Sequence, residues 1–407
     1  MTDLLPVADA LAQVLAGVEA LPVERVPLLE ARGRVLAETL VARRTQPGFD
    51  ASAMDGYALR AAEAAEGAAL TVIGESAAGH AFSGRFATGE AVRIFTGAPV
   101  PDGADAVLIQ ENARREGDVI RVTVAPRPGQ NIRRRGLDFR DGDPALAAGK
   151  RLGPRDLALA AATNHPALPV HRRPRVAILA TGDEIVLPGA PAGPHQIVAS
   201  NTFALAAMAQ AEGADVIDLG IAGDTMAALE AAIRRARDAE ADVLVTIGGA
   251  SVGDRDLVQA ALTREGMSLG FWKIAMRPGK PMMHGGLGRM RILGLPGNPV
   301  SAIVCGVLFL VPLIRALSGR GDRTLARRPA RFAVDWPAND FREDYLRATF
   351  ALDAAAELPM VTPFAVQDSS MVSVLAGADC LAIRPPHAPA AQAGDPCEII
   401  DLNAAGY

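Results

Sequence analysis

Between residues 174 and 317, short apolar runs alternate with longer segments in which apolar positions recur every three or four residues. The runs predict buried strands and the periodic segments predict helices. Strands are expected at 175–180, 216–219, 243–247 and 291–295, and helices at 201–212, 225–239, 257–264 and 299–317. Strands separated by helices indicate a mostly parallel sheet covered on both faces, that is, a three-layer αβα domain.

The ends of these helices carry capping signals. Ser200 or Asn201 is expected to begin the first helix, which Gly213 ends. Asp224 is expected to cap the second, and Asn298 the last, because caps are commonly Ser, Thr, Asp or Asn and glycine commonly follows a helix.

The flanking regions have a different texture. Residues 50–138 contain short β-like runs, at 70–73, 91–95, 106–110 and 119–124, separated by glycine and proline turns. They predict a small β domain, and residues 320–407 predict a second one. The first 49 residues show helical spacing around Val7 and Val14, and Pro154 opens a further helix at 155–162.

Composition excludes several classes of protein. The net charge is −5 and aromatic residues make up 4% of the 407 residues, so neither a basic nor a base-stacking nucleic-acid surface is expected. The longest apolar run, Val300 to Ile314, is too short to span a bilayer and predicts a buried helix. The three cysteines, at 305, 380 and 397, are widely spaced and form no disulfide or zinc pattern. With no basic leader at the start, a cytoplasmic protein without a membrane partner is expected.

Polar and glycine residues follow every strand of the predicted αβα domain. These segments are Gly182 to Glu184, Gly220 to Asp224, Gly248 to Asp256 and Pro296 to Pro299. Ligands of open parallel sheets bind beyond the carboxyl ends of the strands, so these segments predict a binding site.

Two of these segments are suited to binding an anion. Gly248, Gly249 and Ser251 begin a loop whose bare backbone N–H groups could cradle phosphate ahead of a helix. Gly297 and Asn298 could do the same. The alternative for both is a tight strand-to-helix turn with a capping residue, which explains the same residues without a ligand.

Three carboxylates, Glu184, Asp224 and Asp256, are expected at this edge of the sheet. Together with substrate phosphates they would suit Mg²⁺, which prefers oxygen ligands. Helix capping is the alternative for Asp224 and Asp256, because an acidic residue complements the dipole at a helix start.

The basic counterpart is Lys273, Arg277 and Lys280. Lysine occurs only three times in the chain, and two of the three fall in this stretch. Since arginine is the default cation here, lysine indicates a compact point charge, as in the capture of phosphate or another oxyanion. A solvated charged face is the alternative.

In the first β domain, 52–58, 95–101 and 131–138 pair polar or basic residues with glycine turns. Taken alone, these strings are ordinary hairpin turns and a solvated basic run. The basic run could also bind an anion or a partner subunit.

Taken together, these strings resemble the molybdopterin molybdenumtransferase family, of the MoeA and gephyrin E-domain type. The motifs run in the family's order over nearly the whole chain: PGFDASAMDGYA, FTGAPVP, NIRRRGLD, ATGDEIV, GGASVGDRD, AMRPGKP and LPGNPVSA.

The resemblance implies a homodimer of four-domain subunits. Residues 1–49 and 139–172 would form a linking domain, 50–138 an inserted β domain, 173–319 the αβα molybdopterin-binding domain and 320–407 a C-terminal β domain. The implied reaction is attack of molybdate on adenylylated molybdopterin, with release of AMP and the molybdenum cofactor and with Mg²⁺ as cofactor. A molybdopterin-adenylylating protein and molybdoenzyme or chaperone acceptors would be its partners.

The resemblance also implies roles for individual residues. Asp55 and Thr96 would face the pocket of the other subunit. Glu184, Asp224 and Asp256 would hold the metal or the substrate phosphates. Lys273, Arg277 and Lys280 would bind the oxyanion and the pterin phosphate. Phosphate and substrate would further be held by Gly248, Gly249, Ser251, Gly297, Asn298, Arg133, Asp138, Arg342 and Ser369.

Two other functions compete with this one. A molybdopterin adenylyltransferase would share a related αβ domain, but that family carries a Thr-Gly-Gly-Thr-Gly loop and lacks the flanking β domains. A non-catalytic binding scaffold would not need the carboxylates and lysines to be kept together.

Overall fold

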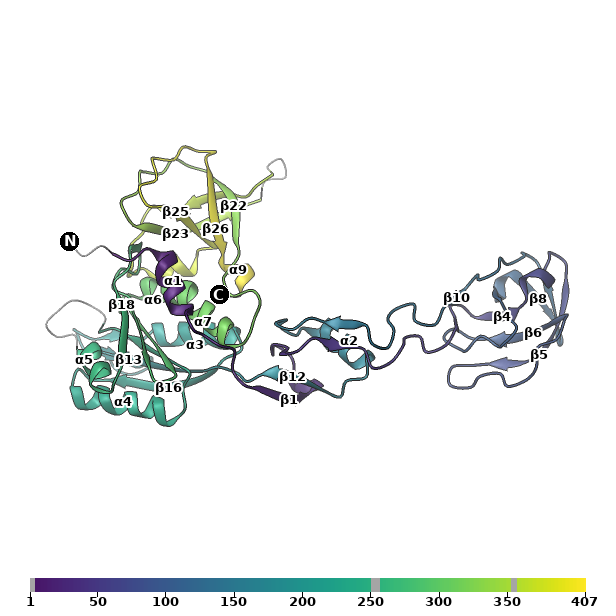
Figure 1. Ribbon diagram of the computed structural model, residues 1–407. Helices are drawn as coiled ribbons and strands as arrows, with labels where there is room; N and C mark the ends of the chain where they lie inside the picture. The colour runs from purple at the N-terminus through teal and green to yellow at the C-terminus, as the bar shows by residue number, and fades with distance from the viewer. Residues whose placement is uncertain (1–3, 250–256, 353–356) are drawn as a thin grey trace.

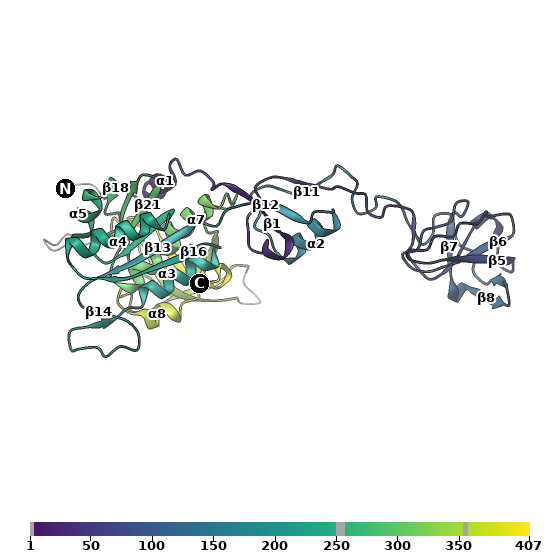
Figure 2. The ribbon, with the colours of Figure 1, turned by 90° about the horizontal axis from the view of Figure 1, so that it is seen from below.

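The computed structural model describes residues 4–249, 257–352 and 357–407. The molecule is elongated: the αβ region and the C-terminal β domain lie at one end, and the first β domain lies at the other (Figures 1 and 2). A narrow linking region that contains β1, β12 and α2 joins them.

The helices of the described residues include short 3-10 turns and one π-helical segment, η4. They are α1 (Val7–Leu15), η1 (Leu28–Glu30), η2 (Ala61–Glu63), η3 (Gln110–Asn112), α2 (Pro154–Ala162), α3 (Asn201–Ala211), α4 (Met226–Asp238), α5 (Leu257–Arg264), α6 (Pro299–Cys305), η4 (Gly306–Leu310), α7 (Val311–Leu317), α8 (Val372–Ala376) and α9 (Leu402–Ala405).

The strands of the first half of the chain build the linking region and the first β domain. They are β1 (Val23–Pro27), β2 (Leu40–Val41), β3 (Ala51–Ser52), β4 (Gly56–Leu59), β5 (Ala69–Ser76), β6 (Glu90–Ile94), β7 (Ala106–Ile109), β8 (Ala113–Glu116), β9 (Val119–Val122), β10 (Ile132–Arg133), β11 (Pro144–Leu146) and β12 (Ala167–His171).

The strands of the second half build the αβ and C-terminal domains. They are β13 (Arg175–Thr181), β14 (Ile185–Val186), β15 (Ile197–Val198), β16 (Asp215–Ala222), β17 (Val243–Ile247), β18 (Ser268–Trp272), β19 (Met276–Arg277), β20 (Met283–Leu287), β21 (Met290–Leu295), β22 (Arg327–Phe332), β23 (Glu343–Ala351), β24 (Met360–Pro363), β25 (Cys380–Arg384) and β26 (Pro396–Asp401).

The αβ domain contains a six-stranded sheet in the order β16-β13-β17-β21-β20-β18. The four predicted strands, β16, β13, β17 and β21, are parallel, which confirms the predicted fold class. β20 and β18 extend the sheet as antiparallel strands, which the sequence pattern did not predict. The sequence of β20, with two glycines among five residues, lacks the β-branched residues that mark a strand.

Helices cover both faces of this sheet, as expected. One buried cluster contains side chains of α3, α6, η4 and α7, and a second contains those of α4 and α5. Residues Pro299–Leu317 are long and apolar enough to cross a membrane by length and composition, yet 89% of the segment is buried inside the protein. It is the core helix that the sequence predicted. Val7, Ala10 and Val14 of α1 also belong to the first cluster, so the N-terminal helix packs on the αβ domain.

The linking region is built from two short antiparallel pairs, β1 with β12 and β2 with β11. Apolar side chains of these strands and of α2 form a small separate core. The chain therefore passes through this region twice, once on the way to the first β domain and once on the way back.

The first β domain is a six-stranded sheet in the order β7-β4-β6-β5-β9-β8 with an apolar cluster on each side. The four predicted strands are present, and β4 and β8 were missed. Gly56 in β4 lies against β7 so closely that a Cβ atom there would be 1.9 Å from the carbonyl oxygen of Leu108. Only glycine fits at that position. Because a strand is recognised in a sequence by its bulky residues, this glycine made β4 hard to predict.

The C-terminal domain is a β barrel. Its strands follow the order β23-β24-β22-β26-β25, and pairing of β25 with β23 closes the sheet. β19, which lies in the segment before β20 of the αβ domain, pairs with β23 through Met276 and Arg277. The two domains therefore share backbone hydrogen bonds and not only side-chain contacts.

Candidate functional site

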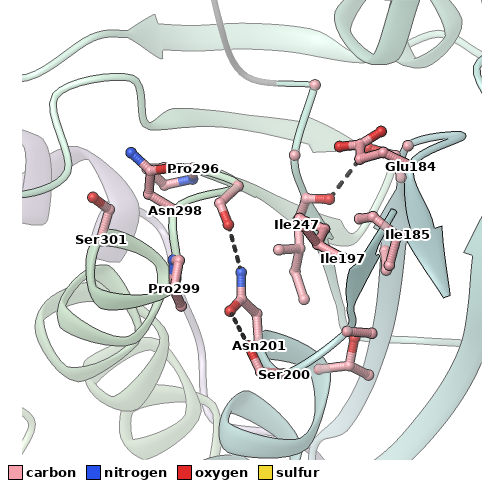
Figure 3. Close-up of a pocket in the computed structure, with 18 of the residues that line it drawn as sticks. Glu184, Ile185, Ile197, Ser200, Asn201, Ile247, Pro296, Asn298, Pro299 and Ser301 are labelled. Carbon is pink, nitrogen blue, oxygen red and sulfur yellow. Dashed lines mark hydrogen bonds between the residues drawn. The ribbon is translucent and has the colours of Figure 1, made fainter. Parts of the chain in front are cut away.

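A pocket of about 740 Å³ opens beyond the carboxyl ends of β13, β17 and β21 (Figure 3). The segments that follow these strands line it, together with the start of α3 and the β14–β15 pair. Among the predicted residues, Glu184, Asp224, Gly248, Gly249, Gly297 and Asn298 line this pocket. The rule that ligands bind at the carboxyl edge of a parallel sheet thus located the pocket correctly.

One glycine, Gly248, allows two strand ends to approach each other, and a second, Gly297, lies beside it. Gly248 has a φ of 88°, and a Cβ atom there would be 2.8 Å from the carbonyl oxygen of Thr181. A Cβ atom on Gly297 would be 3.7 Å from the Cα atom of Gly248. The pocket floor is therefore bare backbone, which suits close approach of a phosphate. Ser251 and Asp256, which the sequence assigned to the same loop, lie outside the described residues.

Among the described residues that line the pocket, two are acidic, Glu184 and Asp224. The carboxylate of Glu184 folds over Gly182, where a Cβ atom would be 2.5 Å from Oε2. The backbone N–H of Asp224 donates to the Asp183 carboxylate at 3.1 Å.

The expectation that Asp224 caps α4 is wrong. Thr225 occupies the cap position, and its hydroxyl accepts a hydrogen bond from the backbone of Ala228 at 3.3 Å. Because Thr225 accepts the backbone hydrogen bond of the first turn, Asp224 is not needed as a cap, and it lines the pocket. Within the described residues no group of three His, Cys, Asp or Glu side chains could hold a metal ion.

Two carboxylates are nevertheless a donor set that fits Mg²⁺. This ion commonly takes one or two protein carboxylates and completes its shell with substrate phosphates and water. Glu184 and Asp224 meet that requirement beside the bare backbone of Gly248 and Gly249.

Asn298 stands at the N-cap of α6 with Pro299 in the first turn, as predicted, but its side chain does not cap the helix. Its amide Nδ2 instead donates to the hydroxyl of Ser369 at 3.0 Å, and the backbone N–H of Val300 donates to the Ser369 carbonyl at 3.1 Å. Two predicted residues that are 71 positions apart are thereby brought together. The C-terminal domain reaches the pocket through this segment, and Ser370 is part of the lining.

Similarly, Asn201 holds the pocket in shape and does not cap α3. Its side-chain amide donates to the carbonyl of Gly297 at 2.7 Å. Ser200 takes the cap position without a capping bond to the helix backbone, and its hydroxyl donates to Oδ1 of Asn201 at 3.2 Å (Figure 3).

The three predicted cations lie in different surroundings, and none of them lines the pocket among the described residues. Lys280 is exposed, and its neighbour Pro281 belongs to the pocket lining. The ammonium of Lys273 lies 4.9 Å from the ring centre of Trp272, and this residue adopts a positive φ of 77°.

Arg277 points to the C-terminal domain. Its guanidinium donates to the Asp344 carboxylate, with one contact of 3.1 Å, and Asp340 lies 3.8 Å away. The hydrogen bond to Asp344 raises the pKa of Arg277, against the effect of burial. This side chain is occupied by an ion pair that joins two domains.

Arg342 is also paired. It binds the carboxylate of Asp340 at 2.5 Å, and this hydrogen bond, against burial, lowers the pKa of Asp340 to about 2. The guanidinium also lies 5.6 Å from the ring centre of Phe341.

Arg347, in β23, is a residue that the sequence analysis missed. It is 1% exposed, and its Nε and Nη2 atoms have no hydrogen-bond partner among the described residues. Burial lowers its pKa. Gln367, two residues before Ser369, bonds both backbone groups of Arg347 at 3.0 and 2.9 Å. The sequence offered no signal for it, because β23 also carries Glu343 and Asp344, and an arginine among charged residues indicates an exposed strand.

The remaining candidates lie in or near the first β domain. The carboxylate of Asp55 accepts two hydrogen bonds of 2.7 Å, from the backbone and the hydroxyl of Thr96. The backbone bond from Thr96 is the main cause of the lowered pKa of Asp55. Arg133, in β10, and Asp138 have exposed side chains in the connection to the linking region. This end of the molecule is far from the pocket of the same chain (Figure 2).

Comparison with known proteins agrees with this architecture. Residues 5–163 match the MoeA N-terminal region (domain I and II), 177–316 a probable molybdopterin binding domain, and 329–402 the MoeA C-terminal region (domain IV). A molybdopterin molybdenumtransferase of Haemophilus influenzae is 36% identical over 88% of this chain and 89% of its own length. One of Bacillus subtilis is 33% identical over 94% of this chain and 90% of its own.

A solved structure shows the same fold. The molybdopterin biosynthesis MoeA protein from Pyrococcus horikoshii superimposes with a TM-score of 0.83 at 30% identity, over 98% of this chain and 99% of that one. With three family regions matched along the chain, the same fold and relatives matched over most of their length, the chain belongs to the MoeA family.

Proposed function

We propose that this protein is a molybdopterin molybdenumtransferase, which inserts molybdate into adenylylated molybdopterin and releases AMP and the molybdenum cofactor. The observation that carries the proposal is the pocket, where bare glycine backbone, two carboxylates and a segment of the C-terminal domain meet. Relatives over most of the chain bear the name of this activity.

The chemical task is to bring two anions together, the phosphoanhydride of the substrate and molybdate. Molybdate is itself nucleophilic, so positioning and electrostatic stabilisation supply most of the catalysis. In this proposal the backbone of Gly248, Gly249 and Gly297 receives the phosphates. Glu184 and Asp224, together with Asp256, would hold Mg²⁺, which would neutralise charge on the phosphoanhydride.

The molybdate oxyanion needs fixed donors, and Arg347 is the best-placed candidate. Its Nε and Nη2 atoms are buried without a partner among the described residues, and its backbone bonds to Gln367, close in sequence to Ser370 of the pocket lining. Lys280, beside Pro281 of the lining, supplies a second positive charge. Arg277 is occupied by Asp344, so its part is to hold the C-terminal domain in place, whereas Arg342 is occupied by Asp340 of its own domain.

We further propose that the active form is a homodimer. Asp55 and Thr96 form a bonded pair at the end of the molecule that lies away from the pocket. An elongated chain can supply such a pair to the pocket of a second copy. The adenylylating protein and the molybdoenzyme or chaperone acceptors would then meet this dimer.

The test is release of AMP from adenylylated molybdopterin, with and without molybdate, in the presence of Mg²⁺. Molybdate-dependent release is the expected result. Formation of adenylylated molybdopterin from ATP, without that release, would identify an adenylyltransferase instead. Absence of both activities would leave a binding scaffold.

A further inference from the structure

A small flap, defined as residues 184–199, stands beside the pocket. It contains β14 and β15, which pair in parallel. The backbone N–H of Ile197 donates to the Glu184 carbonyl at 2.9 Å, and that of Ala199 donates to the Val186 carbonyl at 2.8 Å. At the tip, the side chain of Gln196 accepts a bond of 3.0 Å from Gly193. These bonds give the flap a defined shape.

The flap presents aliphatic side chains to the pocket. Ile197 and Val198 are 60% and 49% exposed, and both line the pocket together with Ile185. Figure 3 shows Ile185 and Ile197 on one side of the pocket, with Asn298 and Ser301 on the other. Large aliphatic side chains left open to water at a polar pocket indicate a surface that a ligand covers.

We propose that Ile197 and Val198 form the wall against which a planar heteroaromatic ring of the substrate packs. This inference rests on the proposed function, whose substrate carries two such rings, a pterin and an adenine. Each has apolar faces and polar edges, which suits one aliphatic wall and an opposite wall of amide and hydroxyl groups. Because the Ile197 N–H bonds to the backbone of Glu184, the flap fixes the ring wall relative to that carboxylate.

The test uses the full chain with Ile197→Ser and Val198→Ser. We expect each change to raise KM for adenylylated molybdopterin about tenfold and to leave kcat within about twofold, since ring packing is the same in the ground and transition states. Ile197→Val should restore most of the affinity. The matched control is Leu187→Ser, because Leu187 is 55% exposed on the same flap but does not line the pocket. Its KM should not change.

Competition distinguishes the two rings. If AMP inhibits Ile197→Ser less than wild type while a free pterin inhibits both equally, the wall holds adenine; the reverse result assigns the pterin. Equal inhibition of both proteins by both compounds, or an unchanged KM in Ile197→Ser, overturns the proposal. So does a loss of dimer in sedimentation without a change in KM, which would make the flap a protein contact.

A failure of the proposed function would appear differently, as a wild-type protein that releases no AMP. Calorimetric titration of wild type and Ile197→Ser with AMP and with the free pterin then still tests the wall. Weaker binding of either compound to the variant supports the wall, and equal binding refutes it.

Discussion

Glu212 lies at the centre of a buried ion network, and its removal gives a sharp prediction of stability. The carboxylate accepts two bonds from Arg315, at 2.9 and 2.8 Å, and further bonds from Arg320 and from the hydroxyl of Tyr407. It is 3% exposed, and each arginine is 7% exposed. The network joins the end of α3, α7, the segment that leads to the C-terminal domain, and the C-terminal residues.

We expect Glu212→Gln to lower the free energy of unfolding by about 3–5 kcal/mol, because two buried guanidinium groups lose their buried charged partner and keep only the exposed carboxylate of Asp322. Tyr407→Phe removes one hydrogen bond to a charged group and should cost about 1.5–3 kcal/mol. Glu240→Gln is the matched control. This change breaks an exposed ion pair with Arg175, in which the Glu240 side chain is 81% exposed. It should lower the free energy of unfolding by about 0–1 kcal/mol.

The assay is the first urea unfolding transition at pH 7, extrapolated linearly to water. The pH dependence is a second check. Burial raises the pKa of Glu212, but the bonds from Arg315 and Tyr407 outweigh it and leave the pKa below its usual value. A carboxyl group whose pKa is lowered in the folded state stabilises the protein at pH values above its pKa in the unfolded chain. This stabilisation is lost as the pH falls through the pKa of the folded state. The gap between wild type and Glu212→Gln should therefore narrow below about pH 4. A cost at pH 7 no larger than that of the control would refute the reasoning.

Three further predictions follow from the site and the core. Arg347→Lys keeps the charge but loses the planar fork, so KM for molybdate should rise about 10–100-fold; saturation curves with molybdate that match wild type would contradict the role given to Arg347. Gly248→Ala places a Cβ against the Thr181 carbonyl at a positive φ, and should cost about 1–3 kcal/mol of stability, measured by urea unfolding, and most of the AMP release. Burial lowers the pKa of His284, so the free energy of unfolding should fall as the pH drops below about 6.5, where the unfolded chain takes up the proton first. His284→Asn should flatten this pH dependence, measured by thermal unfolding between pH 7.5 and 5.5. An equally steep curve for the variant would assign the dependence to other groups.

Much of the αβ domain could be predicted from the sequence. Its four parallel strands and the helices between and after them follow from apolar periodicity, because a strand buried on both faces must be almost wholly apolar. The glycines and carboxylates beyond those strands could be placed for the same reason, since parallel strands end at one edge. β20, β4 and β8 were missed where glycine or charge replaces the bulky residues that a strand pattern needs, and β18 was missed although it carries Leu269, Phe271 and Trp272.

Pairing between domains is what only the tertiary structure decided. The sequence grouped Arg277 with Lys273 and Lys280 as cations near an oxyanion, but the fold turns Arg277 toward Asp344. It treated Asn298 as a cap, whereas the fold joins its amide to Ser369. Arg347 could not be identified, because an arginine in a strand reads as exposed until its neighbours are known. Local sequence patterns record which residues a segment buries, but the partner of a polar group depends on how distant segments pack.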